Sequence, residues 1–375
     1  MTSIIEQEFP QDEELLYLNH AAVSPWPLCT LKAVEEFAQE NVFTGAENYK
    51  RWLGRELRLK NALKSLINAP AAEDIALLKN TSEALSVVAE GLKWHSGDNV
   101  VTSNEEFPSN RIPWEAQKKH GVELREISID CDAEDSLINA CDERTRVLTI
   151  SSVQYGSGHR IHLEKLGRFC RDNNILFCVD AIQSIGAHKL DVQASCIDFT
   201  MADAHKWMLG PEGIALFYCR RELLEHLEVH QFGWHMVEHA GDYDRREWEL
   251  ASNARRFECG SPNMLGIYAL SASIELLNKV GIDYVEAQIA ARVDYLHEKL
   301  GQIAGVEILS RSGGHLSSGI ITFRCEKTDM KNLHQELMRN RVICANRFGG
   351  IRFSPHFYTP YEKLDRAVEI LSGLL

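Results

Sequence analysis

From about residue 56 onward, segments with helical periodicity alternate with short apolar runs, and this alternation constrains the fold most strongly. ELRLKNALKSLINA precedes DIALLKN, and TSEALSVVAEGLKW precedes NVVTSNEEF. Short runs that are apolar throughout, separated by amphipathic helices, are typical of strands covered on both faces of a sheet. The pattern therefore predicts an α/β fold with a large, doubly wound and mostly parallel sheet.

The alternation ends after FECGSPNMLG, where a long amphipathic helix precedes a smaller α+β region. We expect a large domain at 20–265, a small C-terminal α+β domain at 266–375, and an N-terminal segment at 1–19 that packs with the small domain. The segment 230–257 is aromatic and charged but has no clear periodicity. Loops of this length are usually functional or interfacial.

Composition excludes several classes of protein. Forty Lys and Arg residues against 54 Asp and Glu residues give a net charge of −14, which disfavours a broad interface with nucleic acid. No apolar stretch has the length of a membrane span, and the N-terminus lacks the pattern of a signal peptide. The ten cysteines contain no C-x-x-C pair, which favours free thiols in a reducing cytoplasm over disulfides or a zinc site.

Polar residues follow two of the predicted strands at the point where each strand ends. Asp180 and Gln183 come after ILFCV, and Asp203, His205 and Lys206 occupy the turn after IDFTMA. Ligands of open α/β sheets bind beyond the carboxyl ends of the strands. Taken singly, such an aspartate is more often a cap and such a lysine a solvated charge, but a buried carboxylate needs a partner.

As a set, these residues match the reactive edges of pyridoxal 5′-phosphate. Asp180 would keep the pyridine nitrogen protonated, Gln183 would bond the 3′-oxygen, and Lys206 would form the Schiff base. The lysine would then be the catalytic base for an α-amino acid substrate, with Asp180 as the second catalytic residue.

A phosphate site is expected where LLKNTSEAL opens a helix. Thr81 and Ser82 place free amide groups and the positive end of the helix dipole at this point, and His205 would add a donor. A capping box explains the same residues, and the two interpretations are compatible. Phe107, at the end of another strand, would stack on the cofactor ring, although core packing explains it too.

Substrate contacts are expected from two further regions. Arg352 in GGIRFSPHFY is a suitable bidentate partner for an α-carboxylate, although an exposed strand arginine is an equal alternative. Gln154 and Tyr155 in SSVQYGSGHR are the next candidates. Trp234 and His235 in the 230–257 segment complete the set.

The ordered motifs resemble the class V aminotransferase family of fold-type I pyridoxal-phosphate enzymes, which includes cysteine desulfurases, selenocysteine lyases and isopenicillin N epimerase-like proteins. The resemblance runs from residue 17 to about residue 365 and is carried by NTSEAL, EEFPSNRIPW, VDAIQSIGAHKLDV, HKWMLGPEGIALFY, FECGSPN and RFSPHFY. It implies the roles given above for Lys206, Asp180 and Gln183. It also implies a homodimer in which Ser261 reaches the phosphate of the neighbouring subunit, although a helix cap explains Ser261 equally well.

Two departures from the family's desulfurases bear on the reaction. Asp203 stands where those enzymes usually carry serine. Its negative charge would repel the phosphate group unless the side chain turned toward a cation such as His205. Their nucleophilic cysteine lies on a mobile loop before the substrate-binding arginine, whereas here Cys344 lies in an apolar strand and is expected to be inert. We therefore expect transamination or β-elimination of the C–S lyase type, rather than persulfide formation.

Two alternatives stay open from the sequence alone. One is amino-acid epimerisation, as in the isopenicillin N epimerase-like branch, and the other is a non-catalytic binding protein with the same fold. A nicotinamide-dependent enzyme is disfavoured because no G-x-G-x-x-G follows an early strand.

Overall fold

The computed structural model describes residue 5 and residues 7–129, 132–311 and 318–375. Its centre is a seven-stranded sheet with the order β2-β8-β7-β6-β5-β3-β4. The strands are β2 (Ile75–Leu78), β3 (Asn99–Ser103), β4 (Glu123–Ile127), β5 (Thr145–Ser151), β6 (Leu176–Asp180), β7 (Phe199–Asp203) and β8 (Ala215–Cys219). Only β8 runs antiparallel to its neighbours, β2 and β7. The prediction of a large, mostly parallel sheet is confirmed.

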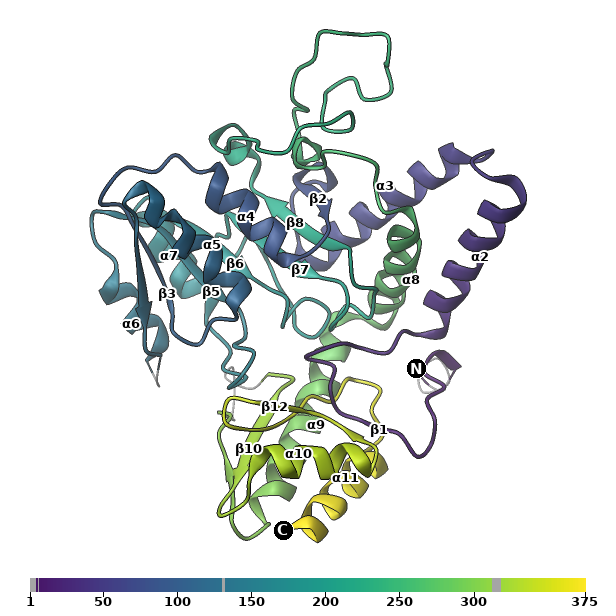
Figure 1. Ribbon diagram of the computed structural model, residues 1–375, viewed down its shortest axis with the longest axis vertical. Helices are drawn as coiled ribbons and strands as arrows, with labels where there is room; N and C mark the ends of the chain where they lie inside the picture. The colour runs from purple at the N-terminus through teal and green to yellow at the C-terminus, as the bar shows by residue number, and fades with distance from the viewer. Residues whose placement is uncertain (1–4, 6, 130–131, 312–317) are drawn as a thin grey trace.

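Both faces of this sheet are covered. Along β6, Phe177 and Val179 belong to one hydrophobic cluster and Cys178 to another, because successive strand residues point to opposite faces. One face packs against α4 (Thr81–Gly91) and the short α5 (Ile112–Glu115). The other packs against α6 (Ala133–Ala140), α7 (Leu163–Asp172) and a helical group formed by α3 (Tyr49–Ile67) and α8 (Met264–Val280) (Figure 1).

Helix α8 belongs to the large domain. It packs against α3 and α2 (Leu28–Thr44), and its buried residues join the larger hydrophobic cluster. The predicted boundary at residue 265 falls before this helix, whereas the chain leaves the large domain only after it. Helix α9 (Ile282–Gly301) then connects the two domains, because Val285 and Ile289 pack with the large domain and Leu296 packs with the small one.

The small domain is built on an antiparallel sheet with the order β12-β13-β10-β9. Its elements are β9 (Val306–Ile308), β10 (Ile321–Cys325), α10 (Met330–Arg339), β11 (Val342–Ile343), β12 (Ala345–Arg347), β13 (Gly350–Phe353) and α11 (Tyr361–Leu374). The N-terminal strand β1 (Leu16–Tyr17) pairs in parallel with β11. Strand β1 therefore lies with the small domain (Figure 1), whereas Ile5 and Phe9 pack against the cluster of the large domain.

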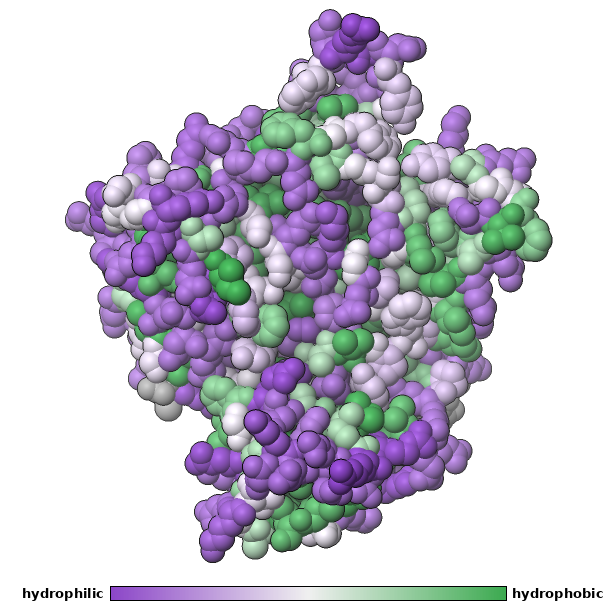
Figure 2. Space-filling model, viewed as in Figure 1, coloured by the Kyte–Doolittle hydropathy of each residue, from purple (hydrophilic) through white to green (hydrophobic). Residues whose placement is uncertain are grey.

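The segment expected to be functional or interfacial forms an arm that projects from the large domain (Figure 1). An antiparallel bridge between Val237 and Leu250 closes its base. Its aromatic side chains are exposed at Phe232, Tyr243 and Trp248, and the tip is strongly hydrophilic (Figure 2). Among the described residues no single helix is long and apolar enough to cross a membrane. Helices α8 and α9 taken together have the length and composition of a span, but they are bent by 83° relative to each other.

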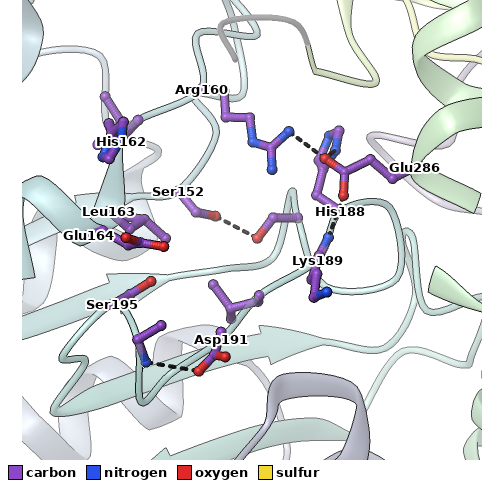
Figure 3. Close-up of a pocket in the computed structure, with 14 residues that line it drawn as sticks. Ser152, Arg160, His162, Leu163, Glu164, His188, Lys189, Asp191, Ser195 and Glu286 are labelled. Atoms are coloured by element: carbon purple, nitrogen blue, oxygen red, sulfur yellow. Dashed lines mark hydrogen bonds and ion pairs between the residues drawn. The ribbon is translucent and has the colours of Figure 1, made fainter. Parts of the chain in front are cut away.

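A charged contact ties α9 to the large domain. Glu286 Oε1 accepts a hydrogen bond from Arg160 Nη1 (2.6 Å) and lies 3.5 Å from His188 Nδ1, while Oε2 accepts the amide N–H of Lys189 (2.9 Å). Burial alone would raise the pKa of Glu286, but these three partners hold it at about 2. The contact borders a cavity of about 450 Å³ that is lined by large-domain residues and Glu286 (Figure 3).

We predict that Glu286→Gln lowers the free energy of unfolding by about 1 to 3 kcal/mol at neutral pH, because Arg160 loses its charged partner. Since folding lowers this pKa from 4.5 to about 2, the stabilisation is present above pH 4.5 and is lost as the pH falls through that range. Urea unfolding of both proteins at several pH values measures the difference. Glu298→Gln, at an exposed position of the same helix, is the control; equal losses in both variants would contradict the prediction.

Candidate active site

Lys206 lies in a tight turn between the antiparallel strands β7 and β8. The amide of Ala204 bonds to the carbonyl oxygen of Ile214 (3.0 Å), which closes the turn. The turn packs closely against Gly186, and only glycine fits at that position, because a Cβ atom at Gly186 would overlap the carbonyl oxygen of Trp207. Burial lowers the pKa of Lys206 to about 8, although the charge of Asp180 opposes the shift.

Asp180 ends β6 as predicted and is almost fully buried. Its Oδ1 accepts the amide N–H of Ile182 (3.0 Å). Burial raises the pKa of Asp180 to about 7, the amide of Ile182 opposes the shift, and the nearby charge of Glu106 adds to it. A carboxyl group in this position is stabilised as an anion by any cationic N–H donor placed against it.

Gln183 is fixed by two contacts. Its Oε1 accepts the indole N–H of Trp207 (2.9 Å), and its Nε2 donates to the carbonyl oxygen of Ala21 (3.0 Å). An amide nitrogen carries two hydrogens, so one donor of Gln183 is left for a ligand. The orientation suits the predicted contact with the 3′-oxygen of the cofactor.

The expected phosphate site contains a carboxylate. Asp203 Oδ2 accepts the amide N–H of Thr81 (3.2 Å), and Thr81 Oγ1 accepts the amide N–H of Asp203 (3.0 Å). Burial raises the pKa of Asp203 to about 6. A phosphate bound through the amide of Thr81 would therefore compete with Asp203 for that donor.

His205 does not supply the positive charge that was expected beside Asp203. Burial and the charge of Lys206 lower the pKa of His205 to about 4, so its ring is neutral at pH 7. Its Nδ1 is buried, lies 4.0 Å from Asp203 Oδ1, and has no hydrogen-bond partner among the described residues. The ring can still bond a phosphate, as a neutral donor.

The remaining phosphate candidates point elsewhere. Ser82 Oγ donates to Ser109 Oγ (2.8 Å) at the exposed start of α4. Ser261 is exposed beside Lys79 and Glu83, in a cleft of about 250 Å³. Within one chain, and among the described residues, no hydrogen bond directs either side chain toward Lys206.

The predicted substrate arginine is buried against the large domain. Arg352 is 2% exposed, and its Nη1 donates to the carbonyl oxygen of Tyr155 (2.7 Å). Its Nε is buried and has no partner among the described residues. Phe107 is 42% exposed, makes an edge contact with the ring of Tyr155 (5.1 Å between centroids), and has Lys206 Nζ 5.8 Å from its ring centre.

The sequence reasoning missed Glu106, one residue before Phe107. This buried carboxylate accepts bonds from Gln154 Nε2 (2.6 Å), Asn110 Nδ2 (2.8 Å) and both the amide and the hydroxyl of Ser151 (2.9 and 2.5 Å). Burial raises the pKa of Glu106 against these four donors. It fixes the predicted substrate contact Gln154, whose Oε1 is left buried without a partner among the described residues.

Two further candidates lie away from this group. His235 Nδ1 is 3.5 Å from Glu258, in a buried cluster with Glu56 and Lys60, and Trp234 packs against the ring of His235 in the arm. Within one chain they are not part of the site around Lys206. Their aromatic and charged character gave no way to distinguish an arm from an active-site wall.

The described residues fit pyridoxal phosphate at its reactive end. Lys206 offers an amine at near-neutral pH, Asp180 offers a buried carboxyl group with few donors, and Gln183 keeps one free N–H. The Nδ1 of His205, which has no partner among the described residues, suits a phosphate oxygen, whereas Asp203 competes with a phosphate for the amide of Thr81.

Comparison with known proteins identifies the family. Residues 16–359 match the family described as Aminotransferase class-V. The chain belongs to the class V aminotransferase family. The family consists of pyridoxal-phosphate enzymes, so this protein is an enzyme that uses this cofactor, as the motifs predicted.

Several class V relatives match this chain over almost their whole length. The probable cysteine desulfurase of Methanothermobacter thermautotrophicus is 30% identical over 100% of this chain and 98% of its own. The uncharacterized aminotransferase YcbU of Bacillus subtilis is 28% identical over 91% of this chain and 90% of its own. These names do not favour the epimerase alternative.

Solved structures confirm the fold. The cysteine desulfurase of Thermococcus onnurineus NA1 is 23% identical, with a TM-score of 0.88 over 99% of this chain and 97% of that one. The cystine C–S lyase C-DES, in complex with its product cysteine persulfide, is 22% identical, with a TM-score of 0.91 over 97% of this chain and 99% of that one. Both support the class V fold expected from the sequence.

We predict that cofactor attachment to the apoenzyme speeds up with rising pH, reaches half its maximal rate near pH 8 and levels off about one pH unit higher. The nucleophile is the neutral amine, and burial lowers the pKa of Lys206 from 10.5 to about 8. The measurement is the initial rate at which the visible absorption band appears after pyridoxal phosphate is added. N-α-acetyl-lysine serves as the reference; a protein rate that climbs in parallel with this reference beyond pH 9 would contradict the shifted pKa.

Proposed function

We propose that this class V enzyme removes the Cα proton of an α-amino acid with Lys206 and then expels a β-substituent, as a C–S lyase does. The observation that carries the proposal is the burial of Lys206, which lowers the pKa of its amine to about 8; the charge of Asp180 opposes this shift and the charge of Arg352 adds to it. This arrangement keeps a neutral amine available as a base at physiological pH.

Arg352 would bind the α-carboxylate of the substrate. Its Nη1 is already used by the carbonyl oxygen of Tyr155, and its Nε is buried and lacks a partner in the described part of the chain. A guanidinium group bonds a carboxylate best through two parallel N–H donors. The free Nε side is therefore the side on which the carboxylate docks.

Pyridoxal phosphate, when bound, supplies an electron sink that stabilises negative charge at Cα. Asp180 holds the proton on the ring nitrogen, and the raised pKa of its carboxyl group favours a strong hydrogen bond there. Lys206 takes the proton from Cα. Phe107 excludes water from the face of the site that it covers.

Persulfide transfer to a protein thiol is not part of the proposal. Cys344 is 3% exposed, and burial raises the pKa of its thiol to about 12. Strand β11 ends at Ile343 and β12 begins at Ala345, so no loop carries this residue toward a substrate. The enzyme would release the leaving group directly, unlike a relative that acts as a cysteine desulfurase.

Transamination is the second candidate, and Phe107 favours it. An elimination gains from an acid near the leaving group, and a phenylalanine side chain cannot donate a proton. Transamination needs only a base that moves the Cα proton, which Lys206 can supply alone.

We also propose that the enzyme is a cytoplasmic homodimer. Ser261 is exposed beside the start of α4, where a neighbouring subunit would meet the phosphate region. The arm 232–250 exposes several aromatic side chains, and such patches favour contact with another protein surface.

The test is a product assay of the holoenzyme with cysteine, cystine and alanine, and with an α-keto acid added as amino acceptor. Pyruvate that forms from cysteine or cystine without the acceptor supports elimination, and an acceptor-dependent keto acid supports transamination. Arg352→Met should raise KM for every active substrate about tenfold to a hundredfold, because a charged hydrogen bond is lost. No turnover of any amino acid by cofactor-loaded protein would refute the proposal.

A further inference from the structure

Two arginines share one face of the hairpin β12–β13. Ala345 lies opposite Arg352 in the antiparallel ladder, and Arg347 lies opposite Gly350. Directly paired residues, and residues two apart on one strand, point to the same face. Arg347 and Arg352 are therefore diagonal neighbours on that face, with backbones roughly 7 to 8 Å apart.

This face is turned toward the substrate loop of the large domain. Arg352 bonds the carbonyl oxygen of Tyr155, and Thr322, its partner on β10, donates from Oγ1 to the carbonyl oxygen of Gly156 (2.7 Å). The ring of Phe348 closes on the same loop, because a Cβ atom at Gly156 would lie 2.9 Å from its Cδ2. The hairpin thus presses against the loop that carries Gln154.

Neither arginine has an anionic partner. Across residues 7–129, 132–311 and 318–375, neither forms an ion pair, and Arg347 Nη1 donates only to the carbonyl oxygen of Asn346 (2.9 Å). Carboxylates outnumber cationic side chains by 54 to 40 in this chain, so a shortage of partners is not the reason. Two neighbouring like charges are unfavourable unless an anion lies between or beside them.

The charge of Arg347 is also felt inside the site. It lowers the pKa of both Lys206 and Arg352, which places the guanidinium group within electrostatic reach of the reacting amine. Unlike Arg352, Arg347 is exposed. It therefore lies at the solvent side of the site.

Arg352 is assigned to the α-carboxylate by the proposed function, and the present inference rests on that assignment. We propose that Arg347 binds a second anionic group, so that the substrate is an α-amino acid with an acidic side chain. A carboxylate and a sulfinate each have two oxygens that share one negative charge and can accept the paired N–H donors of a guanidinium group. Arg347 is then a specificity-determining residue, while Lys206 and Asp180 carry the reaction.

The experiment compares acidic substrates with neutral isosteres on the holoenzyme. The pairs are aspartate with asparagine, glutamate with glutamine, and cysteine sulfinate with cysteine. We expect kcat/KM to favour the acidic member of at least one pair about tenfold or more in the wild-type enzyme. Arg347→Met should remove this preference mainly through KM, and Arg347→Lys should restore part of it.

Controls separate this role from others. Arg339→Met removes one exposed positive charge from α10 and should leave the preference unchanged. The affinity for pyridoxal phosphate should be the same in Arg347→Met and wild type; a parallel loss of cofactor affinity would mean that Arg347 holds the cofactor instead. Equal kcat/KM for acidic and neutral members in the wild type, or an acidic preference that survives in Arg347→Met, would overturn the inference.

A binding measurement distinguishes this failure from failure of the proposed function. Succinate, with two carboxylates, and butyrate, with one, are titrated into the holoenzyme by calorimetry, and neither can react. Tighter binding of succinate that depends on Arg347, without turnover of any amino acid, would retain the anion site and refute the proposed reaction. Turnover of neutral amino acids with equal binding of both acids would retain the reaction and refute the anion site, and failure of both measurements would refute both.

Discussion

The site depends on the burial of one ammonium group. Lys206 lies in the turn after β7 within electrostatic reach of Asp180 and Arg352, and desolvation outweighs the attraction to Asp180. A lysine in water would be almost fully protonated at pH 7 and could neither attack a carbonyl nor remove a Cα proton efficiently. The fold creates the reagent by excluding water from it.

Three parts of the chain hold the turn of Lys206 in place. The amide of Ser24 donates to the carbonyl oxygen of His205 (2.7 Å), and His356 Nε2 lies 3.3 Å from the carbonyl oxygen of Trp207. Gln183 accepts the indole N–H of Trp207. The start of the large domain, the region after β6 and the small domain therefore all contact residues beside Lys206.

The sequence predicted the parts of the fold that are buried on both sides. Strands β5 to β8 read as continuous apolar runs because helices cover both faces, and Asp180 and Lys206 were found because they directly follow such runs. Strand β4 was not predicted: it is an edge strand in which Glu123 and Glu126 are exposed and the other residues are only half-buried. Helix α8 reads as a linker, yet its contacts with α2 and α3 place it in the large domain.

The charge arrangement of the site was less predictable. Asp203 accepts the amide N–H of Thr81, and the ring of His205 is neutral. Neither could be predicted, because both depend on how deeply the side chains are buried, and the local sequence does not give this. Neither Glu106 nor Arg347 was singled out from the sequence. Only the register of the hairpin and the packing of the 154–156 loop against it bring them toward the cofactor side.

Reductive trapping followed by peptide mapping tests the central claim most directly. Borohydride treatment of the holoenzyme fixes the cofactor to the amine that carries it, and mass spectrometry of a digest locates the modified residue. The account predicts one modified peptide, the one that contains Lys206, and loss of that modification in Lys206→Ala. A cofactor bound to another lysine, or a wild-type holoenzyme that yields no modified peptide, would contradict it.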